Sequence, residues 1–332
     1  MTEQLKLKLN DSKATRWGAL VIVAFTMMAA YYVNDVVAPL KTMLETDLAW
    51  SSTDFGFFTG GYSFLNVFFL MLIWGGLILD RFGIRFTGKL ATILMVGGTA
   101  LEYYAMTGLA GADATLFGIN EIFGYKTGVF VAFAGYSIFG VGAEVAGITV
   151  SKIIAKWFKG KELATAMGVQ VALARIGSQA GYAVAIPLAR AFGISTPVLL
   201  GLVLLLGGMI AFFIFAVMDK KLDKQMEAAA IAAGTEDEEE KFSFKDVKNI
   251  LVNPGFWLIA LLCVLFYSCV FPFQKFASEL MIIKYGINEN VAGTFAGLPA
   301  LGALILTPVF GGFIDKRGKS ASIMLLGSAM LI

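Results

Sequence analysis

Histidine is absent from the 332 residues of this chain, and cysteine occurs only twice. Without histidine the chain lacks the most common metal ligand and the usual proton carrier near neutral pH, and a Ser-His-Asp triad is excluded. Cys263 and Cys269 lie in one apolar run, where we expect them to be small packing residues and not a disulfide or a metal site. We therefore expect no cofactor and no metal. No nucleophile–base pair indicates an enzyme.

Charged residues are also scarce. They make up 15% of the chain, whereas hydrophobic residues make up 58% and the mean hydropathy is +0.77. A soluble domain is about half apolar and about one quarter charged. The formal net charge of +2 is too small to indicate a nucleic-acid partner. The composition predicts an all-α protein that crosses the lipid bilayer several times.

Nine apolar segments organise the chain. Eight are long enough to cross a bilayer core, which needs about 20 residues, and the ninth reaches the last residue after only 12. We therefore expect six helices in residues 1–218, a cytoplasmic linker in 219–253, and an incomplete second half in 254–332 that ends inside its helix 9. The segments are Trp17–Leu40, Phe55–Leu79, Leu90–Leu109, Thr127–Val150, Leu163–Ala189, Val198–Met218, Gly255–Phe276, Val291–Ile314 and Ala321–Ile332.

Basic residues alternate between the two sides of these segments. Of 26 lysines and arginines, 20 fall on the side of the N-terminus and five on the other, and Arg175 lies within a segment. Because cytoplasmic loops carry the excess of basic residues, we expect the N-terminus to lie in the cytoplasm.

One short motif occurs twice, in GGLILDRFGIR (75–85) and in GGFIDKRGKS (311–320). Each copy follows the second helix of an expected half. The glycines allow helices to approach closely, and an aspartate at the C-terminal end of its helix opposes the helix dipole and needs a partner. The motif resembles that of the major facilitator superfamily, which implies two six-helix halves with a substrate site between them. The expected gating residues are Gly76, Asp80, Arg81, Gly83, Arg85, Gly311, Asp315 and Lys316.

Two opposite charges lie deep in the apolar segments. Glu144 stands about 12 Å of helix from the cytoplasmic Lys152, and Arg175 about 21 Å from Lys161. Charges at this depth face a cavity or one another. One interpretation is a structural ion pair that locks the two helices together. The other is a binding site in which Arg175 takes a substrate carboxylate and Glu144 takes an ammonium group.

Longer blocks narrow the resemblance. WFKGKELATAMGVQVALARIGS (157–178) and FWLIALLCVLFYSCVFPFQK (256–275) are similar to the lysosomal dipeptide uniporter branch of the superfamily and its bacterial relatives. This resemblance implies that Glu144 and Arg175 hold the two termini of a short peptide. No dileucine-type sorting signal is present near the N-terminus, which favours a bacterial cytoplasmic membrane.

Other polar and aromatic residues are weaker candidates. Gln179 lies on the same stripe as Arg175, and Tyr267 and Phe271 are candidate walls for substrate side chains. Asp35 and Glu102 are candidates for coupling to an ion, so uniport and proton coupling both stay open.

The sequence therefore predicts a secondary transporter that moves dipeptides or related small zwitterions by alternating access. Its partners are a small-molecule substrate and the lipid bilayer, and nothing predicts or excludes an accessory subunit. Two alternatives stay open: a carboxylate anion exchanger of the oxalate–formate type, which has little use for Glu144, and a non-transporting membrane sensor on the same fold.

Overall fold

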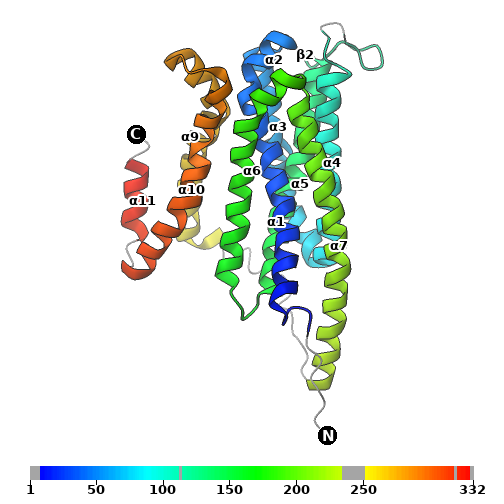
Figure 1. The fold of residues 1–332 in the computed structure, drawn as a ribbon, viewed down its shortest axis with the longest axis vertical. Coiled ribbons are helices and arrows are strands. Elements are labelled where there is room, and N and C mark those ends of the chain that lie inside the picture. The colour runs from blue at the N-terminus through cyan, green and yellow to red at the C-terminus, as the bar shows by residue number, and fades with distance from the viewer. Residues whose placement is uncertain (1–7, 112–113, 234–250, 318–319, 330–332) are drawn as a thin grey trace.

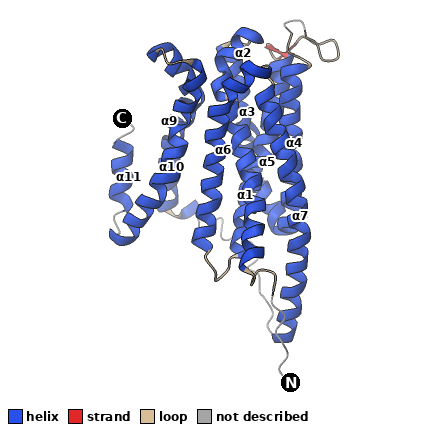
Figure 2. Ribbon diagram, viewed as in Figure 1, coloured by secondary structure: helices blue, strands red, loops and turns tan. Residues whose placement is uncertain are grey.

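The computed structural model describes residues 8–111, 114–233, 251–317 and 320–329, almost all of them in helices (Figure 2). The helices are α1 (Lys13–Val36), α3 (Ser52–Phe68), α4 (Met71–Thr107), α5 (Thr127–Trp157), α6 (Leu163–Phe192), α7 (Thr196–Ala233), α9 (Pro254–Tyr285), α10 (Glu289–Arg317) and α11 (Ser320–Ala329). Shorter elements are η1 (Ala38–Leu40), α2 (Lys41–Asp47) and an antiparallel hairpin of β1 (Glu121–Ile122) and β2 (Tyr125–Lys126). The predicted all-α class is confirmed.

Several of these helices match the thickness of a bilayer. In the described residues, five helices are long and apolar enough to cross a membrane, and α3 with α4 adds a sixth if that bent pair counts as one span. Helix α6 falls outside this group, although its 30 residues extend about 45 Å. The expectation of eight spanning segments is therefore met only in part by hydropathy and length.

Helices α1 to α7 form one bundle, and α9, α10 and α11 lie on its α6 side (Figure 1). We call α1–α7 the first helix group and α9–α11 the second helix group. Helix α10 packs along α6, and α9 packs on η1 and α2. The two groups are thus in contact, and a site between them can be formed by residues from both.

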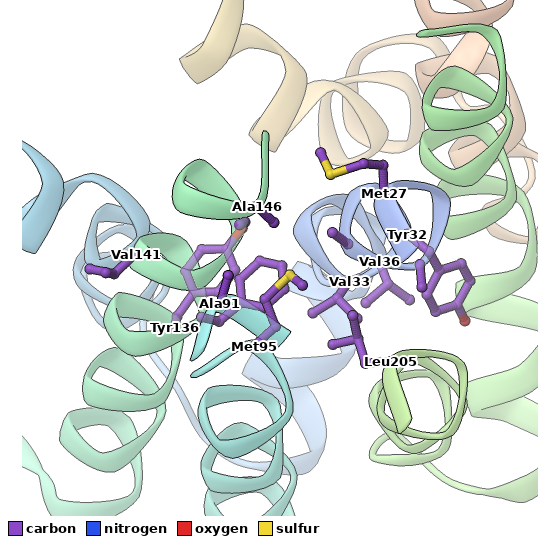
Figure 3. Close-up of a cluster of buried hydrophobic side chains, with 14 of the residues drawn as sticks. Met27, Tyr32, Val33, Val36, Ala91, Met95, Tyr136, Val141, Ala146 and Leu205 are labelled. Carbon is purple, nitrogen blue, oxygen red and sulfur yellow. The ribbon is translucent and has the colours of Figure 1, made fainter. Parts of the chain in front are cut away.

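Helix α1 lies at the centre of the first helix group. Its buried side chains point both toward Met95 of α4 and toward Leu205 of α7 (Figure 3). Tyr32, on the same helix, is buried and its hydroxyl donates to the Pro197 carbonyl oxygen at 3.2 Å. The apolar contacts on two sides of α1 fix its rotation, and this rotation determines which of its residues face the substrate region.

The second expected segment, Phe55–Leu79, is interrupted in the structure. Helix α3 ends at Phe68, and α4 begins at Met71 after a bend of 58°. The break lies at Leu70, whose backbone is left-handed with φ 52°. Hydropathy does not reveal it, because the residues on both sides are apolar and no glycine or proline marks the position.

The expected loop between the second and third segments is a kink within α4. Gly83 has φ 75° and ψ 173°, a conformation that a residue with a side chain rarely adopts, and helical residues flank it on both sides. Further along the chain, α7 continues to Ala233, so the first part of the expected linker, from 219, is helical. Residues 234–250 of that linker lie outside the described residues.

Glycines allow α4 and α5 to approach closely. A Cβ atom on Gly98 would lie 2.4 Å from the Phe139 nitrogen and 2.5 Å from the Gly135 carbonyl oxygen, whereas one on the preceding Gly97 would have no atom within 4 Å. Gly98 is buried and Gly97 is exposed on the bundle surface. Close packing of α4 on α5 therefore requires glycine at 98 but not at 97. A substitution at 97 changes only the helix propensity.

We predict that Gly98→Ala lowers the stability of the purified protein by about 1–3 kcal/mol, because the added methyl group overpacks the α4–α5 contact. Gly97→Ala adds the same methyl group without a clash and is the matched control. It should be neutral or stabilising by up to about 1 kcal/mol, since alanine favours a helix over glycine. Thermal unfolding in detergent measures both, and equal melting temperatures would contradict the close packing of α4 on α5.

Candidate substrate cavity

The two ends of the bundle carry different charged contacts. We call the end with Arg16, Lys152, Lys156 and Lys161 the basic end, and the end with α2 the opposite end (Figure 1). In the sequence-based topology the basic end is cytoplasmic. The ion pairs at each end show whether the two helix groups are held together there.

At the opposite end, Lys41 connects the two helix groups. Its side chain is 2% exposed, and its ammonium nitrogen lies 2.8 Å from Glu45 Oε1, 2.9 Å from Ser52 Oγ and 2.5 Å from Glu279 Oε1. Glu279 belongs to α9, whereas the other partners belong to the first helix group. The ammonium also lies 5.7 Å from the ring centroid of Phe276. A lysine buried this deeply needs such partners.

Three further contacts cross the same end. Arg190 of α6 pairs with Glu289 of α10 and donates to Asn290 Oδ1 at 2.9 Å. The hydroxyl of Tyr182 donates to the carbonyl oxygen of Gln274 at 3.1 Å. Together with Lys41, these contacts close the opposite end between α6, α9 and α10.

At the basic end, the ion pairs of the described residues stay within the first helix group. Asp80 pairs with Lys152 at 2.9 Å, and Arg85 pairs with Asp223 at 2.5 Å and with the fully buried Asp219 at 3.5 Å. The expected motif residues Asp80 and Arg85 therefore connect α4 to α5 and α7.

The remaining motif residues are placed as follows. The Arg81 guanidinium lies over the ring of the adjacent Phe82, at 5.6 Å from its centroid. A Cβ on Gly76 would have no atom within 4 Å. The side chains of Asp315 and Lys316, and Gly311 with them, lie outside the described part of α10. The two motif copies thus cannot be paired from the described contacts.

A cavity of about 520 Å³ lies between the two groups. It is lined by residues of α1, α3, α5 and α9: Met27, Ala30, Tyr31, Asn34, Gly56, Thr59, Gly60, Tyr62, Ser63, Ala143, Glu144, Gly147, Phe271, Pro272, Lys275 and Phe276. The lining is mixed: α1, α3 and α5 contribute small residues together with Tyr31, Tyr62 and Glu144, and α9 contributes two phenylalanines, a proline and a lysine. Its volume is within the range of about 300–1,000 Å³ that is usual for small-molecule sites.

Glu144 lies on the wall of this cavity. Its Oε1 accepts a hydrogen bond from the Tyr62 hydroxyl at 2.8 Å, and the carboxylate is half-buried. No basic side chain of the described residues lies within ion-pair distance of it. Glu144 is therefore an acceptor that faces the cavity with part of its hydrogen-bonding capacity unused.

Arg175 is not among the lining residues of the cavity but stacks on one of them. Its guanidinium carbon is 5.8 Å from the ring centroid of Tyr31, which lines the cavity, and Arg175 itself is half-buried. Within the described chain it makes no ion pair and no side-chain hydrogen bond. The direct Glu144–Arg175 ion pair is absent from this conformation.

The other three predicted substrate residues are divided between the cavity and its surroundings. Phe271 lines the cavity, and Tyr267 stacks on it with 5.0 Å between ring centroids but is itself half exposed. Gln179 turns away toward α10, where its amide nitrogen lies 3.5 Å from the Thr294 carbonyl oxygen.

Neither candidate for ion coupling lines the cavity, but Asp35 contacts two residues that do. Asp35 Oδ1 accepts from the neighbouring Asn34 side chain at 2.8 Å and lies 3.7 Å from the ammonium nitrogen of Lys275. Glu102 is fully buried, and neither of its carboxylate oxygens has a hydrogen-bond partner among the described residues. Of these two carboxylates, Asp35 lies within ion-pair distance of Lys275, whereas Glu102 forms no ion pair with a described residue.

Lys275 is a cavity residue that the sequence analysis missed. The charge count included Lys275 only as one of five basic residues on the outer side, because its apolar segment was expected to end at Phe276 near the membrane surface. The helix in fact continues to Tyr285, and the Lys275 side chain is only 14% exposed. Its position three residues after Pro272, inside a longer helix, was the available signal.

Comparisons with known proteins agree with this architecture. A family model described as Major Facilitator Superfamily matches residues 17–332. The lysosomal dipeptide transporter MFSD1 of Homo sapiens is 27% identical over 321 residues, which cover 92% of this chain and 63% of that protein. MFSD1 of Pongo abelii is also 27% identical, and the match covers 91% of this chain and 61% of that protein. The chain thus spans less than two thirds of the length of these relatives.

Solved structures share the fold. The xylose transporter XylE from E. coli, in a partially occluded inward open conformation, superposes with a TM-score of 0.59 at 16% identity and covers 92% of this chain and 74% of that one. A D-xylose-proton symporter gives a TM-score of 0.58 at 15% identity over 90% of this chain and 69% of that one. At this identity the likeness concerns the fold alone.

We predict that Glu279→Gln loosens the opposite end, because it removes one of the two carboxylates that hold the buried Lys41. A cysteine at Ser278, which is 1% exposed, reports this opening once Cys263 and Cys269 are replaced by serine. Its labelling by a membrane-impermeant thiol reagent should accelerate about tenfold if the closed state loses about 1.4 kcal/mol.

Glu121→Gln is the control for this experiment, since Glu121 lies exposed in β1 at the same end and β1 packs on α5 of the first helix group. Its labelling rate should equal that of the parent protein. An unchanged rate in Glu279→Gln would show that the Lys41 contacts do not hold the end closed.

Proposed function

Because the chain belongs to the major facilitator superfamily, we propose that it carries small zwitterions, dipeptides among them, across a membrane by alternating access. Transporters of this superfamily bind their substrate between two helix groups near the midplane of the bilayer. The cavity between α1, α3, α5 and α9 lies at such a boundary. The first and second helix groups are, in this proposal, the two halves of the transporter, with the charged segment from 219 to 253 between them.

The observation that carries the proposal is the separation of Glu144 from Arg175. Glu144 lines the cavity and Arg175, on the next helix, lies over the lining residue Tyr31, yet the two charges do not pair in this conformation. Leaving opposite charges unpaired inside a membrane bundle is costly unless a ligand or water meets them. A zwitterion supplies an ammonium group for Glu144 and a carboxylate for Arg175, so it satisfies both at once.

The rest of the cavity suits a peptide with variable side chains. A Cβ atom on Gly56 or Gly60 of α3 would meet no atom within 4 Å, so this part of the lining leaves room. Phe271 and Phe276 on α9 offer apolar contact without a specific hydrogen-bonding pattern. Specific polar contacts at the two termini and loose contacts between them are the arrangement expected for recognition of the peptide backbone. The names of the MFSD1 relatives point to the same substrate class.

The closed opposite end fits one stage of the cycle. If the basic end faces the cytoplasm, as the charge pattern predicts, the structure corresponds to a state sealed on the outside. In this proposal Asp80, Arg81 and Arg85 exchange their present partners for Asp315 and Lys316 when the basic end closes. Of the two candidates for proton coupling, Asp35 is better placed than Glu102, because it lies 3.7 Å from the cavity residue Lys275. Without coupling, the protein is a uniporter.

Localisation is part of the same proposal. The chain is a multi-pass membrane protein, and the absence of a dileucine-type signal in its first residues leads us to propose the cytoplasmic membrane of a bacterium. The named relatives are lysosomal transporters.

We predict that dialanine raises the melting temperature of the purified protein, whereas succinate does not. Glu144→Gln should weaken dialanine binding about 10- to 100-fold, because a hydrogen bond to a charged group contributes about 1.5–3 kcal/mol. Glu121→Gln, an exposed carboxylate far from the cavity, is the matched control and should bind like the parent. Stabilisation by succinate alone, undiminished in Glu144→Gln, would favour the carboxylate exchanger instead.

The same preparation in liposomes addresses the remaining alternative. A transporter takes up radiolabelled dialanine, whereas a sensor on this fold binds it and takes none up. Binding without uptake would contradict alternating access and leave the assignment of the cavity intact.

A further inference from the structure

We propose that Lys275 is a second residue that binds the carboxylate of the substrate, so that a bound zwitterion contacts both helix groups. This inference rests on the proposed function, because it concerns how the same cavity recognises its ligand. It differs from the assignment of the carboxylate to Arg175 alone, in which every charged contact comes from the first helix group.

The first reason is position. Of the residues that line the cavity in the described structure, Lys275 carries the positive charge, whereas Arg175 is not part of the lining and lies over the ring of Tyr31 at 5.8 Å. Glu144, on α5, carries the negative charge of the same cavity lining. A ligand in this space therefore meets one group of each sign directly, one from α5 and one from α9.

The second reason is incomplete neutralisation. The Lys275 ammonium donates to the Asn34 carbonyl oxygen at 2.5 Å and to the Tyr136 hydroxyl at 3.1 Å, both of which are neutral. The nearest carboxylate, that of Asp35, lies 3.7 Å away, and its Oδ1 already accepts from Asn34. Two N–H groups of the ammonium are thus used by neutral acceptors, and the ion pair is longer than a hydrogen bond.

A carboxylate in the cavity would improve this arrangement. Charge-assisted hydrogen bonds from an ammonium to a carboxylate are about 2.7–2.9 Å long. Because Coulomb energy varies inversely with distance, a substrate carboxylate at about 2.8 Å is a stronger counter-ion than Asp35 at 3.7 Å by about one third. The third N–H of Lys275 provides the donor. Asp35 then acts as the counter-ion of the empty site and competes with the substrate.

The consequence concerns coupling. A ligand shifts a conformational equilibrium only by its difference in affinity for the two states. A zwitterion bound between Glu144 and Lys275 bridges α5 and α9, which move apart or together as the cavity changes its access. Such a bridge lets the bound substrate shift the equilibrium between the two access states of the cavity directly. Contacts to one helix group alone would not have this effect.

The test compares dialanine with dialanine amide, which lacks only the carboxylate charge. Calorimetry gives the dissociation constants of both ligands for each variant. The measured quantity is the dissociation constant of dialanine amide divided by that of dialanine. We expect this ratio to be about tenfold or more in the parent protein and to fall about tenfold in Lys275→Gln. Lys275→Arg, which keeps the charge, should retain most of the preference for the acid.

Lys41→Gln is the matched control, because Lys41 also bridges the two helix groups but does not line the cavity. It should keep the parent ratio, whatever it does to stability. A Lys275→Gln ratio equal to the parent ratio, with Arg175→Gln abolishing the preference, would assign the carboxylate to Arg175 alone and overturn the inference. A parent protein that binds no dipeptide would overturn the proposed function and this inference with it.

A second variant keeps the inference testable if Lys275→Gln does not fold. Asp35→Asn is nearly isosteric and removes the competing charge from Lys275. The ratio should then rise about threefold or more above that of the parent. A ratio that is unchanged or lower would overturn the role of Lys275 as a carboxylate ligand.

Discussion

A charge inside a membrane-spanning bundle has to meet an opposite charge, several polar groups or an accessible cavity, because lipid offers no solvation. This constraint accounts for the main features of the structure. Lys41 is buried at the opposite end only because two carboxylates and a hydroxyl surround it. Lys275 is held by a carbonyl, a phenol and a more distant carboxylate. Glu144 lacks a cationic partner in the described chain and faces the cavity, so it is the acidic group that a ligand meets.

The same constraint connects binding to movement. The contacts of Lys41 and Arg190 hold α9 and α10 to the first helix group at one end, while the ion pairs of the basic end stay within α4, α5 and α7. Opening the opposite end separates a buried lysine from Glu279, which costs free energy unless new partners form. The substrate is well placed to influence that cost, since the cavity lies directly beside this contact and shares Phe276 with it.

The sequence was sufficient for the fold class and the family, because long apolar runs and the repeated G-x-x-x-D motif depend on local composition alone. It also drew attention to Glu144, since a lone carboxylate in an apolar run is rare. It did not predict the break at Leu70, where a left-handed leucine interrupts a uniformly apolar run. It missed Lys275 because segment ends are poorly defined by hydropathy, so a residue ten positions before the end of α9 was counted with the basic residues of the outer membrane side. The direction of the Gln179 side chain, toward α10, depends on tertiary packing, and residue spacing along the helix did not predict it.

The most direct measurement is competition for uptake of radiolabelled dialanine into liposomes that contain the purified protein. The account predicts inhibition by other unmodified dipeptides and little inhibition by N-acetyl dialanine, dialanine amide or succinate, because only a zwitterion satisfies both signs of charge in the cavity. Equal inhibition by a blocked peptide and by its free parent would contradict the recognition of two opposite charges.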